Sequence, residues 1–173
     1  KLVAVEGLGP PPKMIQEHIN APSWKLISNW IDQVRKLSSR QPRRYPDIDA
    51  AAHRMQEENS FLSPEQAHHL TVHGVARNED GTFSWKFDNY TRAFYPQSFQ
   101  PEQRKAMWKR ITCPTLLIRG SESWAGDPEE DGRADAFQDA TLVNVEGAGH
   151  WVHHDRLPEF LALVRDFCGD EAG

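Results

Sequence analysis

The 173-residue sequence has few cysteines and no long apolar run. Its two cysteines, Cys113 and Cys168, are too few for a disulfide framework. No stretch approaches the roughly 20 apolar residues that a membrane-spanning helix needs. The opening residues KLVAVEGLG predict a strand and a turn, without the cleavage region of a secretory signal. These features together predict a cytoplasmic protein.

The sequence also lacks an excess of positive charge. Its net charge is -5 and its pI is about 5.9, so the overall charge gives no reason to expect binding to nucleic acid or to an anionic membrane. A local basic run extends from Arg35 to Arg44, but it lies among Ser, Gln and Pro, which favours a solvated loop. We therefore expect no nucleic-acid partner and no membrane partner.

Three short apolar runs predict strands that are covered on both faces. They are LVAVEG at 2–7, PTLLIRG at 114–120 and ATLVNVEG at 140–147. Helical patterns at 101–112, 129–138 and 157–168 alternate with the later strands; the last has Leu157, Phe160, Leu161, Val164 and Phe167 on one side. This alternation predicts an α/β fold with a parallel sheet and right-handed crossovers.

The section between the first two strands has a different character. Helical spacing runs from Met14 to Ser39 with a break at Pro22, and Asp47 and Ser63 are placed as N-caps of two further helices. Phe83, Trp85 and Phe87 alternate as in a short strand. We therefore expect an inserted, mainly helical domain at 13–99 and a core formed by residues 1–12 and 100–173.

Three parallel strands make a small sheet, and the first strand would leave a long apolar edge exposed. The hydrophobic fraction of 38% and the mean hydropathy of -0.69 are also low for a self-sufficient α/β domain. We expect the remaining strands upstream, on a lost segment or on a partner chain.

Two segments carry a resemblance to a known family. CPTLLIRGSES at 113–123 and DATLVNVEGAGHWVHHDRLPEFLALVRDF at 139–167 resemble the C-terminal part of the α/β-hydrolase fold. The inserted section resembles the cap of serine-hydrolase-like, haloalkane-dehalogenase-like and epoxide-hydrolase-like members. The resemblance implies the C-terminal half of an α/β-hydrolase sheet with an inserted helical cap.

The family's catalytic histidine corresponds to His150, in the G-x-G-H element that follows the third strand. The resemblance implies that His150 acts as a general base towards the nucleophile or a water. His153 and His154 follow it, and we expect both to be exposed.

The acid partner of His150 has three candidates. The usual family position, three residues after Gly120, holds Ser123. Some members place the acid directly after the preceding core strand, and Glu6 stands at the matching place. We favour Glu6 over Asp127, and Asp127 over Glu122.

The nucleophile that the family requires is absent. No G-x-S-x-G or G-x-D-x-G elbow occurs in the sequence, and the family order places it upstream. We therefore expect a partner, the N-terminal half, on the same precursor or on another chain. An upstream serine would favour a small apolar ester-like substrate, and an aspartate would favour dehalogenation or epoxide opening. The alternative is a non-catalytic relative that binds a ligand or partner.

Aromatic residues of the inserted section predict an apolar substrate pocket or, alternatively, the small core of that section. They are Trp24, Trp30, Trp85, Phe87, Phe94 and Tyr95, and Trp151 beside His150 could join them. The chemistry implies no organic cofactor and no metal. His69 and His73, four apart on a helix, could bind a metal, but no further ligand of matching spacing completes a set.

Overall fold

The computed structural model describes residues 1–93 and 100–169. The chain divides into two compact units, the first formed by residues 1–20 and 99–173 and the second by residues 21–98. Helix α1 (Pro12–Asn20) belongs to the first unit, whereas the sequence pattern placed it in the inserted section.

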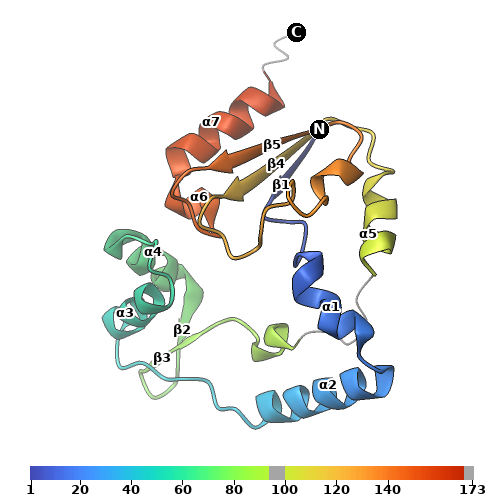
Figure 1. Ribbon diagram of the computed structural model, residues 1–173. Helices are drawn as coiled ribbons and strands as arrows, with labels where there is room; N and C mark the ends of the chain where they lie inside the picture. Colours follow the sequence, from blue (N-terminus) through green and yellow to red (C-terminus); the bar gives the residue numbers. More distant parts are fainter. Residues whose placement is uncertain (94–99, 170–173) are drawn as a thin grey trace. The chain divides into compact units, whose positions relative to one another are not determined.

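The first unit contains a parallel sheet of β1 (Leu2–Val5), β4 (Thr115–Gly120) and β5 (Ala140–Val145) (Figure 1). The order β1-β4-β5 places β4 in the centre. Leu2 is opposite Thr115 on one side of β4, and Thr115 is opposite Ala140 on the other. The predicted α/β fold with parallel strands is confirmed.

The core of this unit lies between β4, β5 and the two C-terminal helices, α6 (Val152–Asp155) and α7 (Leu157–Cys168). Its fully covered members are Leu116, Ile118, Val145, Ala148 and Val152. Helix α7 packs Phe160, Leu163, Val164 and Phe167 against them. Leu157 and Leu161 lie on the same side of α7 by helical spacing, but both are exposed.

The prediction of a helix at 129–138 is wrong, because this segment forms turns and a short 3₁₀ helix, η2 (Ala134–Ala136). Before β4, the segment predicted to be helical forms α5 (Pro101–Trp108). Gly132 has a φ of +70°, which is outside the helical region. The carboxylates of Asp127 and Asp131 accept from the backbone N–H groups of Glu129 and Arg133, so local side-chain bonds replace a helical ladder.

The second unit contains three helices, α2 (Ser23–Ser38), α3 (Ile48–Glu58) and α4 (Pro64–Gly74), an antiparallel pair, β2 (Val75–Arg77) and β3 (Phe83–Trp85), and the 3₁₀ helix η1 (Asn89–Arg92), within its described residues. Asp47 caps α3 by accepting from Ala50 N–H, and Ser63 and Gln66 form a capping box on α4. Both caps agree with the sequence pattern. The core of this unit is small, with Tyr45, Ala51 and Val75 at its centre.

Among the described residues, we find no helix whose length and apolar content would allow it to cross a bilayer.

Candidate active site

The candidate site lies at the carboxyl edge of the sheet in the first unit. Glu6 follows β1, the segment 121–133 follows β4, and the turn 146–151 follows β5. Because the three strands are parallel, these segments leave the sheet at the same edge. The sheet therefore brings together residues that are more than 140 positions apart in the sequence.

Glu6 and His150 are in contact at this edge. One carboxylate oxygen of Glu6, Oε2, lies 3.3 Å from His150 Nδ1, and the other, Oε1, accepts a 2.8 Å hydrogen bond from Gly120 N–H. The Glu6 side chain is 5% exposed, and that of His150 is 32% exposed. A carboxylate at Nδ1 favours the imidazole tautomer with its proton on that nitrogen, which leaves Nε2 as a proton acceptor.

Glu6 has a strained backbone. Its φ of +52° lies in the left-handed region, which non-glycine residues seldom adopt. Its N–H nevertheless donates to Ile118 O at 2.9 Å, so the residue leaves the strand while it is still bound to β4. Such strain persists only where surrounding contacts hold it, and it is concentrated at functional sites. The bend and the bond to Gly120 together direct the carboxylate towards His150.

The turn that carries His150 is held by side chains on both of its sides. Gly147, with a φ of +65°, donates its N–H to Ser121 Oγ at 2.9 Å. Gly149 donates its N–H to Asp155 Oδ2 at 2.8 Å. The positive φ at Gly147 explains why this position of the turn is a glycine. The bond from Gly149 to Asp155 fixes the backbone directly before His150.

Two neighbours of His150 were not singled out as functional from the sequence. Ser123 Oγ lies 3.4 Å from His150 Nδ1, and the exposed Trp124 places its ring centroid 4.6 Å from that of the imidazole. Ser123 stands at the position where the usual family pattern has the acid, so the sequence could have indicated that it lies near His150. No comparable signal exists for Trp124, because a tryptophan in a polar loop has many possible neighbours.

The other two candidate acids lie elsewhere. Asp127 Oδ2 is 3.6 Å from Arg119 Nη1, and Asp127 also caps its own loop through Glu129 N–H. Glu122 is exposed, beside the hydroxyl of Ser121. Of the three carboxylates considered, Glu6 is the one in contact with His150.

The aromatic residues expected to line a substrate pocket are distributed over both units. Trp85 packs against the small core of the second unit, and Phe87 lies 6.4 Å from its ring. Trp24 is exposed and Trp30 half-buried on α2. Trp151, in the first unit, packs edge-on against His154. Phe94 and Tyr95 lie outside the described residues.

The remaining histidines differ in their surroundings. His153 is exposed as expected, but His154 is half-buried, so the expected exposure of His154 is wrong. Burial lowers the pKa of His154, the neighbouring His153 lowers it further, and Asp155 raises it. His69 and His73 face each other with ring centroids 4.8 Å apart. In the part of the chain that is described, no group of three or more potential ligands is placed to hold a metal ion.

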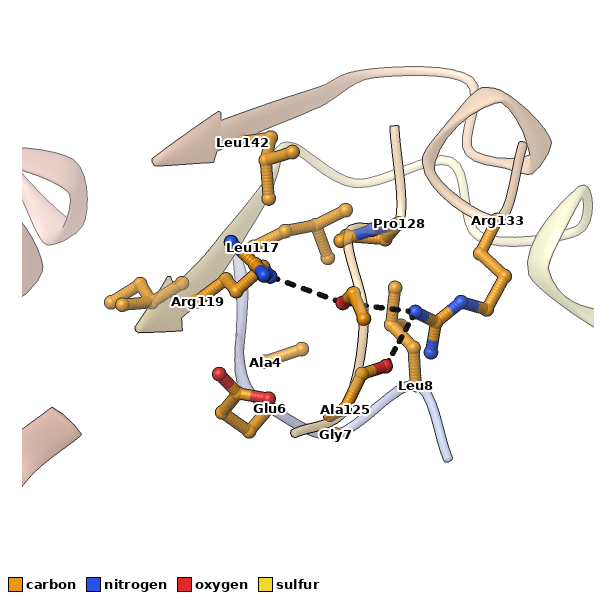
Figure 2. A pocket seen from close by; sticks show the side chains of 12 residues that line it. Ala4, Glu6, Gly7, Leu8, Leu117, Arg119, Ala125, Pro128, Arg133 and Leu142 are labelled. Carbon is orange, nitrogen blue, oxygen red and sulfur yellow. Dashed lines mark hydrogen bonds between the residues drawn. The ribbon is translucent and has the colours of Figure 1, made fainter. Parts of the chain in front are cut away.

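A buried arginine ties the segment after Glu6 to the loop after β4. Arg133 Nη1 donates to Gly9 O at 2.7 Å, and Nη2 donates to Ala125 O at 3.0 Å and Gly126 O at 3.2 Å. Its Nε binds both carboxylate oxygens of Asp131. Figure 2 shows Arg133 directed at this loop beside a pocket that Glu6 also lines. Arg133 therefore holds together the two segments that carry Glu6 and Ser123.

The sequence and the fold of the chain can be compared with those of known proteins. A model of the alpha/beta hydrolase family matches residues 2–163. The chain belongs to the alpha/beta hydrolase family. It is 31% identical over 90 residues to the sn-1-specific diacylglycerol lipase ABHD11 of Mus musculus, a match that covers 50% of this chain and 28% of the relative. It is 24% identical over 136 residues to the esterase YbfF of Escherichia coli K12, covering 74% of this chain and 52% of the relative.

Solved structures of the family agree with the fold. A thioesterase domain from the curacin biosynthetic pathway is 25% identical with a TM-score of 0.70, covering 84% of this chain and 51% of that structure. An esterase of M. tuberculosis has the same TM-score at 16% identity, covering 97% and 53%. The chain thus spans about half the length of these structures and of YbfF, and the matched residues cover about a quarter of the lipase.

Proposed function

We propose that this chain supplies the general base and the acid of a hydrolase active site, and that the nucleophile comes from an N-terminal half carrying a G-x-S-x-G elbow. His150 is the base and Glu6 the acid. The observation that carries the proposal is the Glu6–His150 contact at the carboxyl edge of the parallel sheet. The free edge of β1 also supports it, since among the described residues no strand pairs there.

The proposed chemistry is acyl transfer on a small apolar ester-like substrate. His150 Nε2 takes the proton of the serine hydroxyl as the serine oxygen attacks the ester carbonyl. The same proton then passes to the leaving alcohol, which gives an acyl-enzyme. Water, deprotonated by His150, attacks the acyl-enzyme. The imidazolium then returns this proton to the serine oxygen, which leaves as the carboxylic acid is released and the enzyme is restored. Glu6 holds Nδ1–H throughout and stabilises the imidazolium that forms in each step.

The proposed roles of the two units follow from this chemistry. The first unit supplies His150 and Glu6, and the second unit corresponds to the inserted cap. Esterase and lipase relatives favour serine over aspartate as the nucleophile. The chemistry that we propose uses only positioned side chains and needs no organic cofactor.

The first experiment is intact-mass analysis and N-terminal sequencing of every polypeptide that copurifies with the chain. We expect a polypeptide that contains the G-x-S-x-G elbow, joined to this chain or bound to it. If the chain is alone and folded, and its gene encodes no upstream half, the proposal is wrong.

The second experiment measures the hydrolysis of p-nitrophenyl butyrate by the assembled protein. Glu6→Gln should lower kcat by about 10⁴-fold, because loss of the orienting carboxylate favours the wrong tautomer. Glu122→Gln is the matched control, since this exposed carboxylate lies on the same edge, and it should keep kcat within about threefold. Equal effects of the two substitutions would overturn the assignment of Glu6.

A further inference from the structure

Helix α2 of the second unit has an apolar stripe that is open to solvent. Trp24 is 72% exposed, Ile27 44% and Ile31 37%, and α2 contains no buried residue. At 3.6 residues per turn, these three side chains lie within about 60° of one another around the helix. A single exposed apolar residue is ordinary, whereas an aligned stripe that includes a tryptophan indicates a contact surface.

Basic side chains border this stripe. Lys25 and Lys36 lie on the adjacent polar flank, about 100–120° from Trp24, and Arg35 continues the stripe one turn beyond Ile31. Arg40, Arg43 and Arg44 follow the helix directly. Segment 23–44 therefore carries six basic side chains and a single acidic one, Asp32, in a chain whose net charge is -5.

Some of these charges are neutralised locally, and the others are open. Arg35 lies 3.8 Å from Asp32, and Arg44 pairs with Asp80. Lys25, Lys36, Arg40 and Arg43 are exposed. The concentration of positive charge beside an apolar stripe is the complement of an anionic surface with an apolar interior.

The net charge of the whole chain leads us to expect no membrane partner, but the local arrangement differs, and we propose that α2, with the basic segment that follows it, docks on an anionic lipid surface. Trp24, Ile27 and Ile31 would enter the boundary between headgroups and acyl chains, while Lys25, Lys36, Arg40 and Arg43 contact the anionic headgroups. The helix would lie in the plane of the surface, since its 16 residues include a strongly polar face. This surface would bring an apolar ester-like substrate and the protein together.

The test is cosedimentation of the assembled protein with two kinds of vesicle, one of phosphatidylcholine alone and one containing 30% phosphatidylserine. We expect at least tenfold stronger partition into the anionic vesicles and a loss of that difference at high salt. Ile27→Ser should weaken partition by about tenfold, because an apolar side chain no longer enters the lipid. Phe61→Ser is the matched control, since Phe61 is exposed outside α2, and it should leave partition unchanged.

A second pair of variants tests the charges. Lys25→Gln with Lys36→Gln should weaken partition by about 25-fold, at roughly fivefold for each base lost near the surface. Lys13→Gln with Arg110→Gln removes the same charge from exposed sites of the first unit and should have little effect. Equal partition into both vesicles, or equal losses in both pairs, would overturn the proposal.

Sedimentation velocity on the same protein variants without vesicles tests the alternative that a second copy of the chain covers this stripe. A chain that self-associates, becomes monomeric on Ile27→Ser and ignores anionic vesicles would assign the stripe to a second copy and overturn lipid docking. Vesicle binding requires no catalytic step, so failure here leaves the proposed hydrolase function untouched. In the same way, a negative result in the esterase assay would not contradict lipid docking.

Discussion

The two compact units use their apolar residues in different ways. In the first unit, the central strand β4 has neighbours on both edges and is buried almost throughout, and the candidate site is built on its carboxyl end. In the second unit, the core is small, while Trp24, Ile27, Phe61 and Phe87 remain exposed. The rigid sheet can hold side chains at fixed distances, whereas the helical unit offers apolar surface for contacts.

The largest effect should come from the point where two backbones of the first unit meet. A Cβ at Gly120 would lie 2.2 Å from Gly149 O and 2.4 Å from Ala148 O. Gly120→Ala should therefore lower the free energy of unfolding of this unit by about 3 kcal/mol or more, as measured by urea denaturation. Gly7→Ala is the control, because its Cβ would make only ordinary contacts at 3.7 and 3.8 Å. Equal stability of the two variants would disprove the close approach.

The next effect concerns the arginine that joins the segments around the site. Arg133→Met would leave the carbonyls of Gly9, Ala125 and Gly126 without their donor, and Asp131 without its cation. We expect the free energy of unfolding of the first unit to fall by about 3 kcal/mol, because these carbonyl oxygens and the carboxylate would remain partly buried without a hydrogen-bond donor. Hydrogen exchange should show faster opening of residues 121–131 and no change in α3 and α4. A uniform increase over both units would contradict a local role.

A smaller effect is expected in the second unit. Ser63→Ala removes the hydroxyl that accepts from Gln66 N–H, and with it half of the capping box on α4. The expected loss is about 1 kcal/mol in the free energy of unfolding of this unit. Ser63→Asn should recover most of it, since asparagine is also a good N-cap. No loss in the alanine variant would show that α4 is held by its packing alone.

The smallest effect is a pH dependence beside the site. Because the pKa of His154 is lowered by burial, folding favours its neutral form. The stability associated with this form is fully present above the unfolded pKa, about 6.5, and is lost as the pH falls through the lower folded pKa. His154→Gln should flatten the decline in unfolding free energy that begins as the pH falls below about 6.5. An unchanged decline would assign it to other groups.

Much of the fold could be predicted from the sequence, because strands and caps are local. Apolar runs ending in glycine predicted β4 and β5, and side-chain oxygens ahead of helical spacing predicted the caps at Asp47 and Ser63. The segment 129–138 was mistaken for a helix because its acidic and alanine content outweighed Gly132. Its actual conformation depends on side chains that bond their own loop.

The candidate site was only partly predictable. The G-x-G-H element indicated His150, and the position after β1 indicated Glu6, but neither pattern gives a distance between residues so far apart. Arg133 and Asp155 could not be selected from the sequence, because their roles depend on which backbone groups the fold brings near them. The exposure of Trp24 is likewise a property of packing and not of the helix pattern.

The tautomer of His150, measured by ¹⁵N NMR of the ring nitrogens at high pH, shows whether Glu6 orients the imidazole. We expect a proton on Nδ1, directed at Glu6. In Glu6→Gln, Gly120 N–H requires the amide oxygen, so the amide NH₂ faces Nδ1 and the proton should move to Nε2. Ser123→Ala should retain the wild-type tautomer. The same tautomer in the wild-type protein and in Glu6→Gln would contradict the assignment of Glu6 as the residue that orients His150.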